Sequence, residues 1–256
     1  MRGWLREIAG LVLPVACGGC GRPRTELCPR CREELAGPGP RRVRPVPEPA
    51  GLPVVHASAP YADAVRSVLL AHKERGALSL AGPLGSALAG AVEAAAGCCD
   101  ASGTHPLLLV PVPSSRRSVR ARGHDPTRRI ALAAAGRLRS RGRAARVIPV
   151  LRQRRAVADQ SGLGARGRFA NLAGALEVVT GGARLMEGGR VVLVDDLMTT
   201  GASLTEAARA LSAVHLPFIQ ARSEGTAENG TPERRFVQAA AAVVACSPSS
   251  FEINRN

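Results

Sequence analysis

The sequence predicts an α/β protein in which a doubly wound, mostly parallel sheet follows a small four-cysteine module. Short apolar runs typical of strands alternate with helical patterns over residues 54–246, and this alternation favours parallel strands joined by helices. Two Cys-x-x-Cys pairs lie within residues 1–35. The composition, 45% hydrophobic and 21% charged, is that of a globular chain and excludes a largely disordered one.

The cysteine module is the first element. Cys17 and Cys20, followed by Cys28 and Cys31, form two Cys-x-x-Cys turns, and each turn can present two thiolates to one ion. Two such turns together complete a tetrahedral site for Zn²⁺. The alternative is a pair of disulfides in an exported protein.

The segment before the cysteines bears on that alternative. An apolar stretch, Ile8–Ala16, follows basic residues as in an export signal, but Gly10 and Pro14 interrupt it and it runs directly into the first cysteine pair. We therefore expect residues 2–13 to form a short amphipathic helix and the protein to be cytoplasmic, with cleavable or lipidated export as the alternative. The longest apolar runs, such as Leu107–Val112, are shorter than the ~20 residues that span a bilayer, so no membrane span is expected.

The next elements follow in order. Residues 36–53 contain six prolines and are expected to form an extended linker to the main domain, residues 54–246. The patterns in the first half of that domain predict a strand at 54–59, a helix from Tyr61 to His72, a helix at about 77–97 and a strand at 106–112.

The second half continues the alternation. We expect helices at 126–141 and 203–213, and strands at 146–151, 175–179, 190–195 and 236–246. A polar insertion occupies residues 220–235, and residues 247–256 are expected to be a frayed tail.

The positive charge is concentrated in one part of the chain. Of the formal net charge of +15, residues 111–170 carry +14, from sixteen arginines against Asp125 and Asp159. A field concentrated on so short a stretch favours a polyanionic partner, either a phosphorylated small molecule or a nucleic acid. The alternative is a solvated surface that reflects biased residue usage, since Lys73 is the single lysine in the sequence.

A strand–loop–helix pattern carries the most specific chemistry. Four apolar residues, Val191–Val194, precede Asp195 and Asp196, and a short loop then leads into the helix near Leu204. Backbone amides at a helix start bind phosphate, and carboxylates beside them accept from sugar hydroxyls, so a ribose 5-phosphate fits both groups. The alternative is a generic strand end and a capped helix. The loop residues expected to hold the phosphate are Thr199, Thr200, Gly201, Ala202 and Ser203.

This pattern resembles the signature of the type I phosphoribosyltransferases, in which four apolar residues, two acids and a Thr-Thr-Gly loop follow one another. The four-cysteine module makes the chain similar to the ComF (competence-associated) branch of that superfamily, over about residues 10–213. The chain departs from that branch at His124-Asp125-Pro126, where an aromatic residue, Asn and Gln usually stand. Further landmarks shared with the branch are Lys73-Glu-Arg-Gly76, Pro111-Val-Pro113, Arg122-Gly123, Gln160, Gly162-Leu163, Arg168 and Asn171.

The resemblance implies a ligand and roles for named residues. The fold would be of the type I phosphoribosyltransferase kind, and the ligand would be 5-phosphoribosyl-1-pyrophosphate (PRPP) with Mg²⁺. Asp195 and Asp196 would grip the ribose, and Lys73 would help to bind the ligand. Pyrophosphate would lie on the loop after the first strand, at Pro113, Ser114 and Ser115. Arginines that would stabilise the leaving group are Arg122, which joins the acids as a catalytic residue, and Arg116, Arg117, Arg120, Arg152, Arg154 and Arg155.

Three functions remain open at this point. The first is phosphoribosyl transfer to an acceptor that no motif identifies, in DNA uptake or nucleotide-related metabolism. The second is a non-catalytic competence factor that binds single-stranded DNA, works with DNA-uptake proteins and senses the sugar phosphate. Phe169 is the single aromatic residue of the basic stretch, so such binding would be mostly electrostatic. The third is a zinc-stabilised adaptor with a vestigial ligand site.

Overall fold

The computed structural model describes residues 15–97, 105–155, 165–213 and 239–252. The expectations that lie outside these residues are the helix at 2–13, the insertion at 220–235, and the landmarks Gln160, Gly162 and Leu163.

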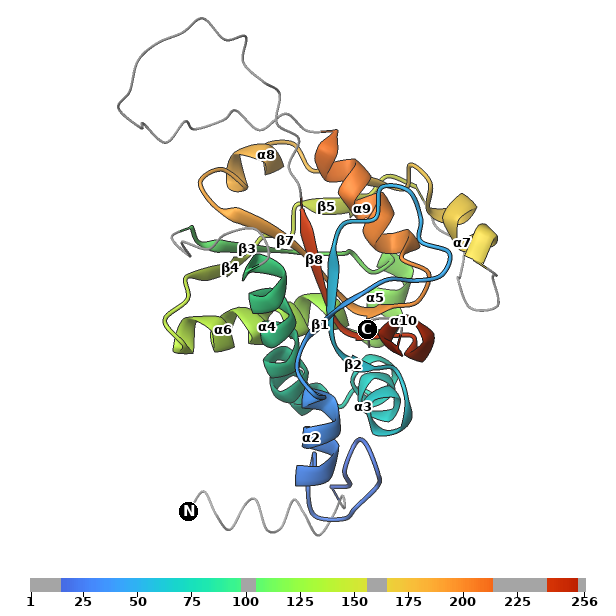
Figure 1. The fold of residues 1–256 in the computed structure, drawn as a ribbon, viewed down its shortest axis with the longest axis vertical. Coiled ribbons are helices and arrows are strands. Elements are labelled where there is room, and N and C mark those ends of the chain that lie inside the picture. The colour runs from blue at the N-terminus through green and yellow to red at the C-terminus, as the bar shows by residue number, and fades with distance from the viewer. Residues whose placement is uncertain (1–14, 98–104, 156–164, 214–238, 253–256) are drawn as a thin grey trace, which may run out of the picture.

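The centre of the molecule is a six-stranded sheet with the order β1-β2-β8-β7-β3-β4 (Figure 1). Only β1, at one edge, is antiparallel to its neighbour; the four other pairings are parallel. The α/β class and the mostly parallel sheet are therefore confirmed. The strands of this sheet are β1 (Arg41–Val43), β2 (Val55–Pro60), β3 (Leu107–Pro111), β4 (Ala145–Val147), β7 (Arg190–Met198) and β8 (Ala240–Cys246).

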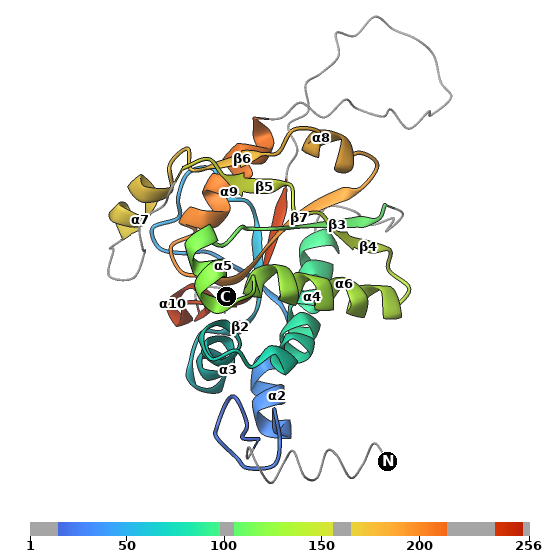
Figure 2. The same ribbon diagram turned by 180° about the vertical axis from the view of Figure 1, so that it is seen from behind.

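Helices cover both faces of the sheet (Figures 1 and 2). Leu107 and Leu109 of β3 face the core shared with α3, α4 and α6, whereas Leu108 and Val110 face the core shared with α9 and α10. This two-sided burial explains the continuous apolar runs of the central strands. The helices are α2 (Pro29–Ala36), α3 (Asp63–Glu74), α4 (Ala81–Gly97, after a 3-10 turn η1 at Leu78–Leu80), α5 (Arg116–Arg122), α6 (Pro126–Ser140), α7 (Ala165–Leu172), α8 (Gly182–Leu185), α9 (Ala202–Ser212) and α10 (Pro248–Glu252).

The longest helix, α4, packs closely against α6. A Cβ on Gly85 would lie 2.5 Å from the Cβ of Ala133 and 2.8 Å from the backbone nitrogen of Ala134, so glycine sets the distance between the two helices. The segment Leu78–Gly97 is apolar and long enough to cross a membrane by length and composition alone. Its inner face is buried against the sheet and α6, as in a core helix.

One expected strand is divided between two sheets. In place of a single strand at 146–151, β4 ends at Val147 and β5 (Leu151–Gln153) pairs with β6 (Leu176–Val178) in a separate two-stranded antiparallel sheet. Pro149 lies between the two strands and has no N–H to donate, which ends the pairing with β3. The strand expected at 175–179 is therefore present but does not belong to the main sheet.

Several segments for which no helix was expected are helical, namely α2, α5, α7, α8 and α10. The basic stretch after β3 contains α5, which Ser115 begins by accepting a hydrogen bond from the amide of Ser118 at 3.0 Å. The expected tail begins with α10, whose Phe251 is 7% exposed and lies beneath the guanidinium of Arg41 at 5.5 Å from the ring centroid.

The cysteine module and the proline-rich segment both pack against the sheet domain. The buried cysteines share one apolar cluster with Ala64 and Ala71 of α3. Within residues 36–53, β1 pairs with β2. A Cβ on Gly201 of the Thr-Thr-Gly loop would lie 2.9 Å from Leu52 Cδ1. The segment expected as a linker therefore forms one sheet edge and supports that loop.

Candidate functional site

The acid pair lies near the carboxyl end of β7. The strand was expected to end at Asp195, but the parallel ladder to β8 continues through Asp195 and Leu197 to Met198. Asp196 is 5% exposed, whereas Asp195 is partly exposed. The backbone amide of Asp196 donates to Asp195 Oδ1 at 2.8 Å. The carboxyl group of Asp195 is therefore held by the strand backbone.

Lys73 is the cation of this acid pair. Its ammonium Nζ lies 2.8 Å from Asp196 Oδ2, and the lysine side chain is 32% exposed against 7% for the aspartate. The residue stands in the last turn of α3, next to the fully buried His72. The structure thus brings together two residues that the sequence analysis placed in one site.

The three charges set each other's protonation. Burial would raise the pKa of Asp196, but the Lys73 ammonium outweighs it and lowers that pKa below its ordinary value. Burial and the Asp196 carboxylate together raise the pKa of Asp195 well above its ordinary value. The charge of Asp196 in turn raises the pKa of Lys73. The pair is therefore asymmetric: Lys73 shifts Asp196 toward its ionised form, and Asp195 is shifted in the opposite direction.

The Thr-Thr-Gly loop connects β7 to α9. Gly201 directly precedes the helix and has a φ of +78°. Residues with a Cβ adopt this left-handed backbone conformation only at a cost in free energy. The amide of Ala202 points to Thr200 Oγ1 at 3.5 Å, and Thr205 donates to the carbonyl of Gly201 at 2.9 Å. Thr199 is exposed and Ser203 is partly exposed. The loop thus presents hydroxyls and helix-start amides beside the acid pair.

The loop after β3 lies next to β7. Val112 donates to the carbonyl of Val194 at 2.9 Å, which carries the sheet pairing into the loop of Pro113, Ser114 and Ser115. Parallel strands end at the same edge of a sheet, so this loop and the acid pair share one edge.

The start of α6 closes this side of the site. Ser114 Oγ lies 3.5 Å from Asp125 Oδ1, and Asp125 also accepts from the amide of Arg128 as the helix cap. Thr127 Oγ1 lies 3.4 Å from Asp195 Oδ1. Thr127 is not among the residues expected in the site, and its only signal in the sequence is its position in the first turn after a helix cap.

Arg122 lies at the end of α5, near α3. Its Nε donates to Glu74 Oε2 at 2.9 Å, and Glu74 immediately follows Lys73. Two residues further, the His124 ring contacts the ring of His72 edge-on, with 5.6 Å between centroids. The last turn of α3 therefore contacts both the acid pair and the end of α5.

The other candidate arginines have different surroundings. Arg152 and Arg154 both form ion pairs with Glu177 of β6, at 2.8 and 3.2 Å, within the two-stranded β5–β6 sheet. Arg155 donates to the carbonyls of Asn171 and Ala173 at 2.9 Å each. These contacts stabilise the β5–β6 sheet and the end of α7. Within α5, the exposed arginines are Arg116, Arg117 and Arg120.

A cavity of about 590 Å³ lies beside the first turns of α9. It opens between α7, α9 and the proline-rich segment, and its lining reaches Ala202, the residue that follows the Thr-Thr-Gly loop. Its lining includes Gly51, Phe169, Leu172, Ala202 and Thr205.

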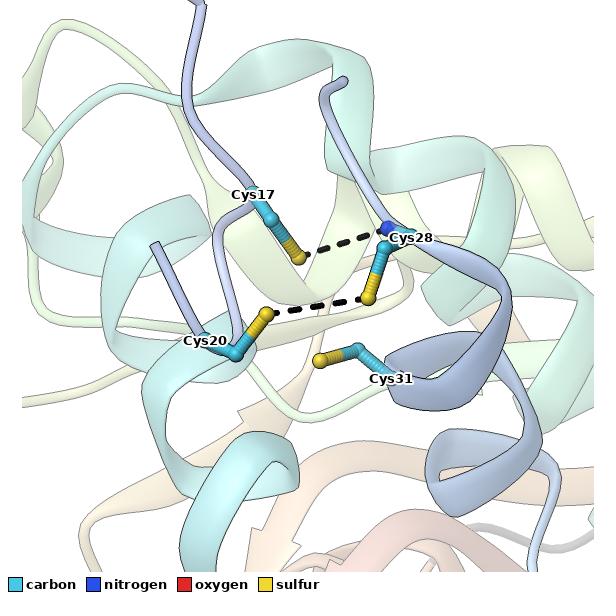
Figure 3. Close-up of side chains that lie close together, drawn as sticks. All are labelled: Cys17, Cys20, Cys28 and Cys31. Atoms are coloured by element: carbon cyan, nitrogen blue, oxygen red, sulfur yellow. Dashed lines mark hydrogen bonds between the residues drawn. The ribbon is translucent and has the colours of Figure 1, made fainter. Parts of the chain in front are cut away.

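The four cysteines of the N-terminal module converge on one point (Figure 3). All four sulfur atoms lie within 4.8 Å of one another, and the Sγ atoms of Cys20 and Cys28 are 3.6 Å apart. Four thiolates at 2.3 Å from one tetrahedral ion stand about 3.8 Å apart, so the cluster fits such an ion. The four thiols are free rather than joined in disulfides. The cluster could therefore bind a metal ion such as zinc.

The module favours a thiolate at one position. Burial opposes ionisation of Cys17, but amides of Cys20, Cys28 and Gly19 outweigh it and lower the pKa of Cys17 to about 6. The amide of Cys28, for example, lies 3.3 Å from Cys17 Sγ. Thiolates are the form that binds metal, so the backbone of the module prepares it for an ion.

The remaining described cysteine has no such setting. Cys246 is fully buried at the end of β8, and burial raises its pKa to about 12. It packs as a small apolar residue. Cys98 and Cys99 lie outside the described residues.

Comparison with known proteins adds no assignment to this geometry. No protein-family model matches the chain, and no curated protein matches it.

Proposed function

We propose that this chain binds PRPP at the carboxyl end of β7, as a phosphoribosyltransferase-like protein of the ComF kind. One observation carries the proposal: Asp195 and Asp196, balanced by Lys73, stand directly before a Thr-Thr-Gly loop that opens α9. Few ligands need carboxylates and a phosphate cradle side by side, and a ribose 5-phosphate is one of them.

The residues divide the ligand between them. The ribose 2′- and 3′-hydroxyls donate to the carboxylates of Asp195 and Asp196, while the 5′-phosphate accepts from the amides and hydroxyls of Thr199–Ser203. Lys73 holds Asp196 ionised and so keeps it an acceptor. The Asp195 carboxyl, whose pKa is raised, becomes a stronger acceptor when a cation enters the site.

The pyrophosphate belongs on the neighbouring loop. Pro113, Ser114 and Ser115 follow β3, which pairs with β7, and Arg122 supplies positive charge from the end of α5. In the transfer, the bond from ribose C1 to the pyrophosphate oxygen breaks and its electron pair leaves with pyrophosphate, while an acceptor nucleophile bonds C1. Fixed cations that stabilise the leaving group are the protein's contribution. Mg²⁺, bound with the ligand, would neutralise phosphate charge and would be held mainly by oxygens of the ligand and by water, with few or no direct protein ligands.

The ion of the cysteine module is inferred to be Zn²⁺. Four cysteine ligands in tetrahedral spacing are typical of closed structural zinc sites. A structural ion suits the position of the module, whose cysteines pack in one apolar cluster with residues of α3.

A second candidate function rests on the charged surface. Exposed arginines occur on α5, α6 and β4, and this number of exposed cations favours binding of single-stranded DNA through its phosphates. Such binding is compatible with PRPP in the same protein, as a competence factor that senses the sugar phosphate would require. The exposed arginines of these elements are Arg116, Arg117, Arg120, Arg128, Arg129, Arg137, Arg139 and Arg146.

Titration calorimetry with PRPP, with and without Mg²⁺, tests the main proposal. Wild type should bind PRPP with Mg²⁺, and Asp195→Asn with Asp196→Asn should abolish binding while the circular dichroism spectrum is unchanged. Inorganic pyrophosphate is the matched probe for charge alone, and Glu93→Gln, far from the acid pair on α4, is the control variant. Equal affinity for pyrophosphate and PRPP, or full binding by the double variant, would contradict the proposal.

A further inference from the structure

The His124 ring joins two segments of backbone. Its Nδ1 lies 3.1 Å from the carbonyl oxygen of Arg122, and its Nε2 lies 3.2 Å from the carbonyl oxygen of His72 on α3. Both acceptors are carbonyls, so the ring makes both hydrogen bonds at once only when doubly protonated, and a neutral ring keeps one of them. In either state the ring fills the space between the loop and the helix.

The neighbouring His72 supports this arrangement from inside the core. It is fully buried and its Nδ1 lies 3.3 Å from the carbonyl of Ala77. Burial lowers the pKa of His72, which favours the uncharged form of the ring that His124 contacts edge-on.

A second tie runs parallel to the first. Arg122 Nε donates to Glu74 Oε2 at 2.9 Å. Three consecutive residues of α3 therefore reach the site: the carbonyl of His72 to His124, Lys73 to Asp196, and Glu74 to Arg122. The side chain of Arg122 is thus held directly by the helix turn that carries the cation of the acid pair, and the His124 ring lies between the Arg122 carbonyl and that same turn.

We propose that His124 and Glu74 are positioning residues that hold Arg122 in place for the pyrophosphate group of PRPP, an inference that rests on the proposed function. Arg122 is the last residue of α5, the helix that follows the loop of Pro113, Ser114 and Ser115. An arginine side chain that is ordered before the ligand arrives loses less conformational freedom on binding. The ties act on the pyrophosphate end of the ligand only, because the 5′-phosphate and the ribose hydroxyls belong to the β7 loop and the acid pair.

This division gives a test based on two ligands. Ribose 5-phosphate has the phosphate and hydroxyls of PRPP but no pyrophosphate. His124→Phe keeps an aromatic ring against His72 and removes both ring nitrogens. We expect it to weaken PRPP binding about ten-fold, or about 1.4 kcal/mol, and to change ribose 5-phosphate affinity by less than about two-fold. Glu74→Gln should weaken PRPP binding about three-fold, since exposed ion pairs are weak.

The controls separate the possible failures. Glu93→Gln breaks a similar pair, in which Arg141 Nη1 lies 2.7 Å from Glu93 Oε2, and should change neither affinity. Adding His124→Phe to Arg122→Met should cost nothing beyond Arg122→Met alone, because the tie acts through Arg122. Equal losses for both ligands, or additive losses in the double variant, would overturn the inference while leaving PRPP binding intact. If the wild type binds neither ligand, the proposed function itself fails and the inference fails with it.

Discussion

Lys73 Nζ lies 2.8 Å from Asp196 Oδ2, although 123 positions separate the two residues in the chain. The contact joins the last turn of α3 to the carboxyl end of β7. The negative charge of Asp196 is thereby balanced by the lysine ammonium, whereas the pKa of Asp195 is raised mainly by burial. A site of this charge suits a ligand that brings hydroxyls and a cation rather than a bare anion.

Replacing Lys73 should destabilise the protein in a pH-dependent way. The folded pKa of Asp196 lies below its ordinary value of 3.8, so its ion pair stabilises the fold above that pH and the stabilisation is lost as pH falls through the folded pKa. Lys73→Met should therefore lower the free energy of unfolding by about 2 kcal/mol at pH 7, at the low end for a partly exposed pair, and by less below about pH 4. Urea unfolding at several pH values measures this difference.

The control for that experiment is a surface pair. Arg30 and Glu34 lie 3.0 Å apart, but the arginine side chain is 83% exposed. Arg30→Met should leave the free energy of unfolding almost unchanged at any pH, because the pair is exposed to solvent. A loss for Lys73→Met that is constant from pH 7 to pH 3 would contradict the assigned ion pair.

Gly201→Ala should damage the Thr-Thr-Gly loop through both conformation and contact. The residue has a φ of +78°, and an added Cβ would lie 2.9 Å from Leu52 Cδ1. Gly142 is a matched control, because its φ is +79° and nothing lies within 4 Å of an added Cβ. Gly142→Ala should cost about 1–2 kcal/mol from backbone strain alone, and Gly201→Ala should cost more and also weaken PRPP binding. Equal unfolding midpoints with unchanged PRPP affinity would refute this view of the loop.

Two glycines of α4 should respond in opposite directions. Gly85→Ala places a methyl group 2.5 Å from Ala133 Cβ and 2.8 Å from the nitrogen of Ala134, so it should separate α4 from α6 and cost about 1–3 kcal/mol. Gly82→Ala meets nothing within 4 Å and should gain up to about 1 kcal/mol from helix propensity. Thermal unfolding of both variants measures the contrast, and a stabilised Gly85→Ala would show that the helices can move apart freely.

Metal removal should affect more than the N-terminal module. Metal analysis should find about one zinc per chain, and its removal by a chelator should lower Tm by at least about 5 °C, or roughly 2 kcal/mol. The reason is that Cys17, Cys28 and Cys31 belong to the core that also contains α3. Cys28→Ser should reproduce the loss, and Cys246→Ala should keep the metal. Absence of bound metal from freshly purified, reduced protein would exclude the zinc assignment.

Nucleic-acid binding should depend steeply on salt. If about six phosphates of a single strand are neutralised, log K should fall with log salt at a slope of about −4. Replacing the exposed residues Arg128 and Arg129 by glutamine should reduce that slope by about 1.4, as measured by fluorescence anisotropy over a salt series. A slope near zero would remove the second candidate function.

Local patterns predicted the main features of the fold. The spacing of Cys17, Cys20, Cys28 and Cys31 predicted one cluster, because two turns of this kind bring four sulfurs together. Continuous apolar runs predicted the central parallel strands, since both faces of the sheet are covered.

The differences have identifiable causes. β7 runs three residues beyond Asp195 because pairing with β8 outweighs the poor strand propensity of aspartate. Ser115 and Gly123, which begin and end α5, are signals that could have predicted that helix. The contacts of His72 with His124, and of Lys73 with Asp196, depend on tertiary packing between distant segments. No local pattern contains that information.

The proline-rich segment limits how the chain can be divided. A fragment that starts at residue 54 would lack β1, leaving an open strand edge on β2, which invites pairing with other molecules. It would also lose Leu52 and Pro49 from behind Gly201. Truncation at this boundary, though suggested by the run of prolines, would therefore harm solubility and ligand affinity together, and the undivided chain is the material on which binding should be measured.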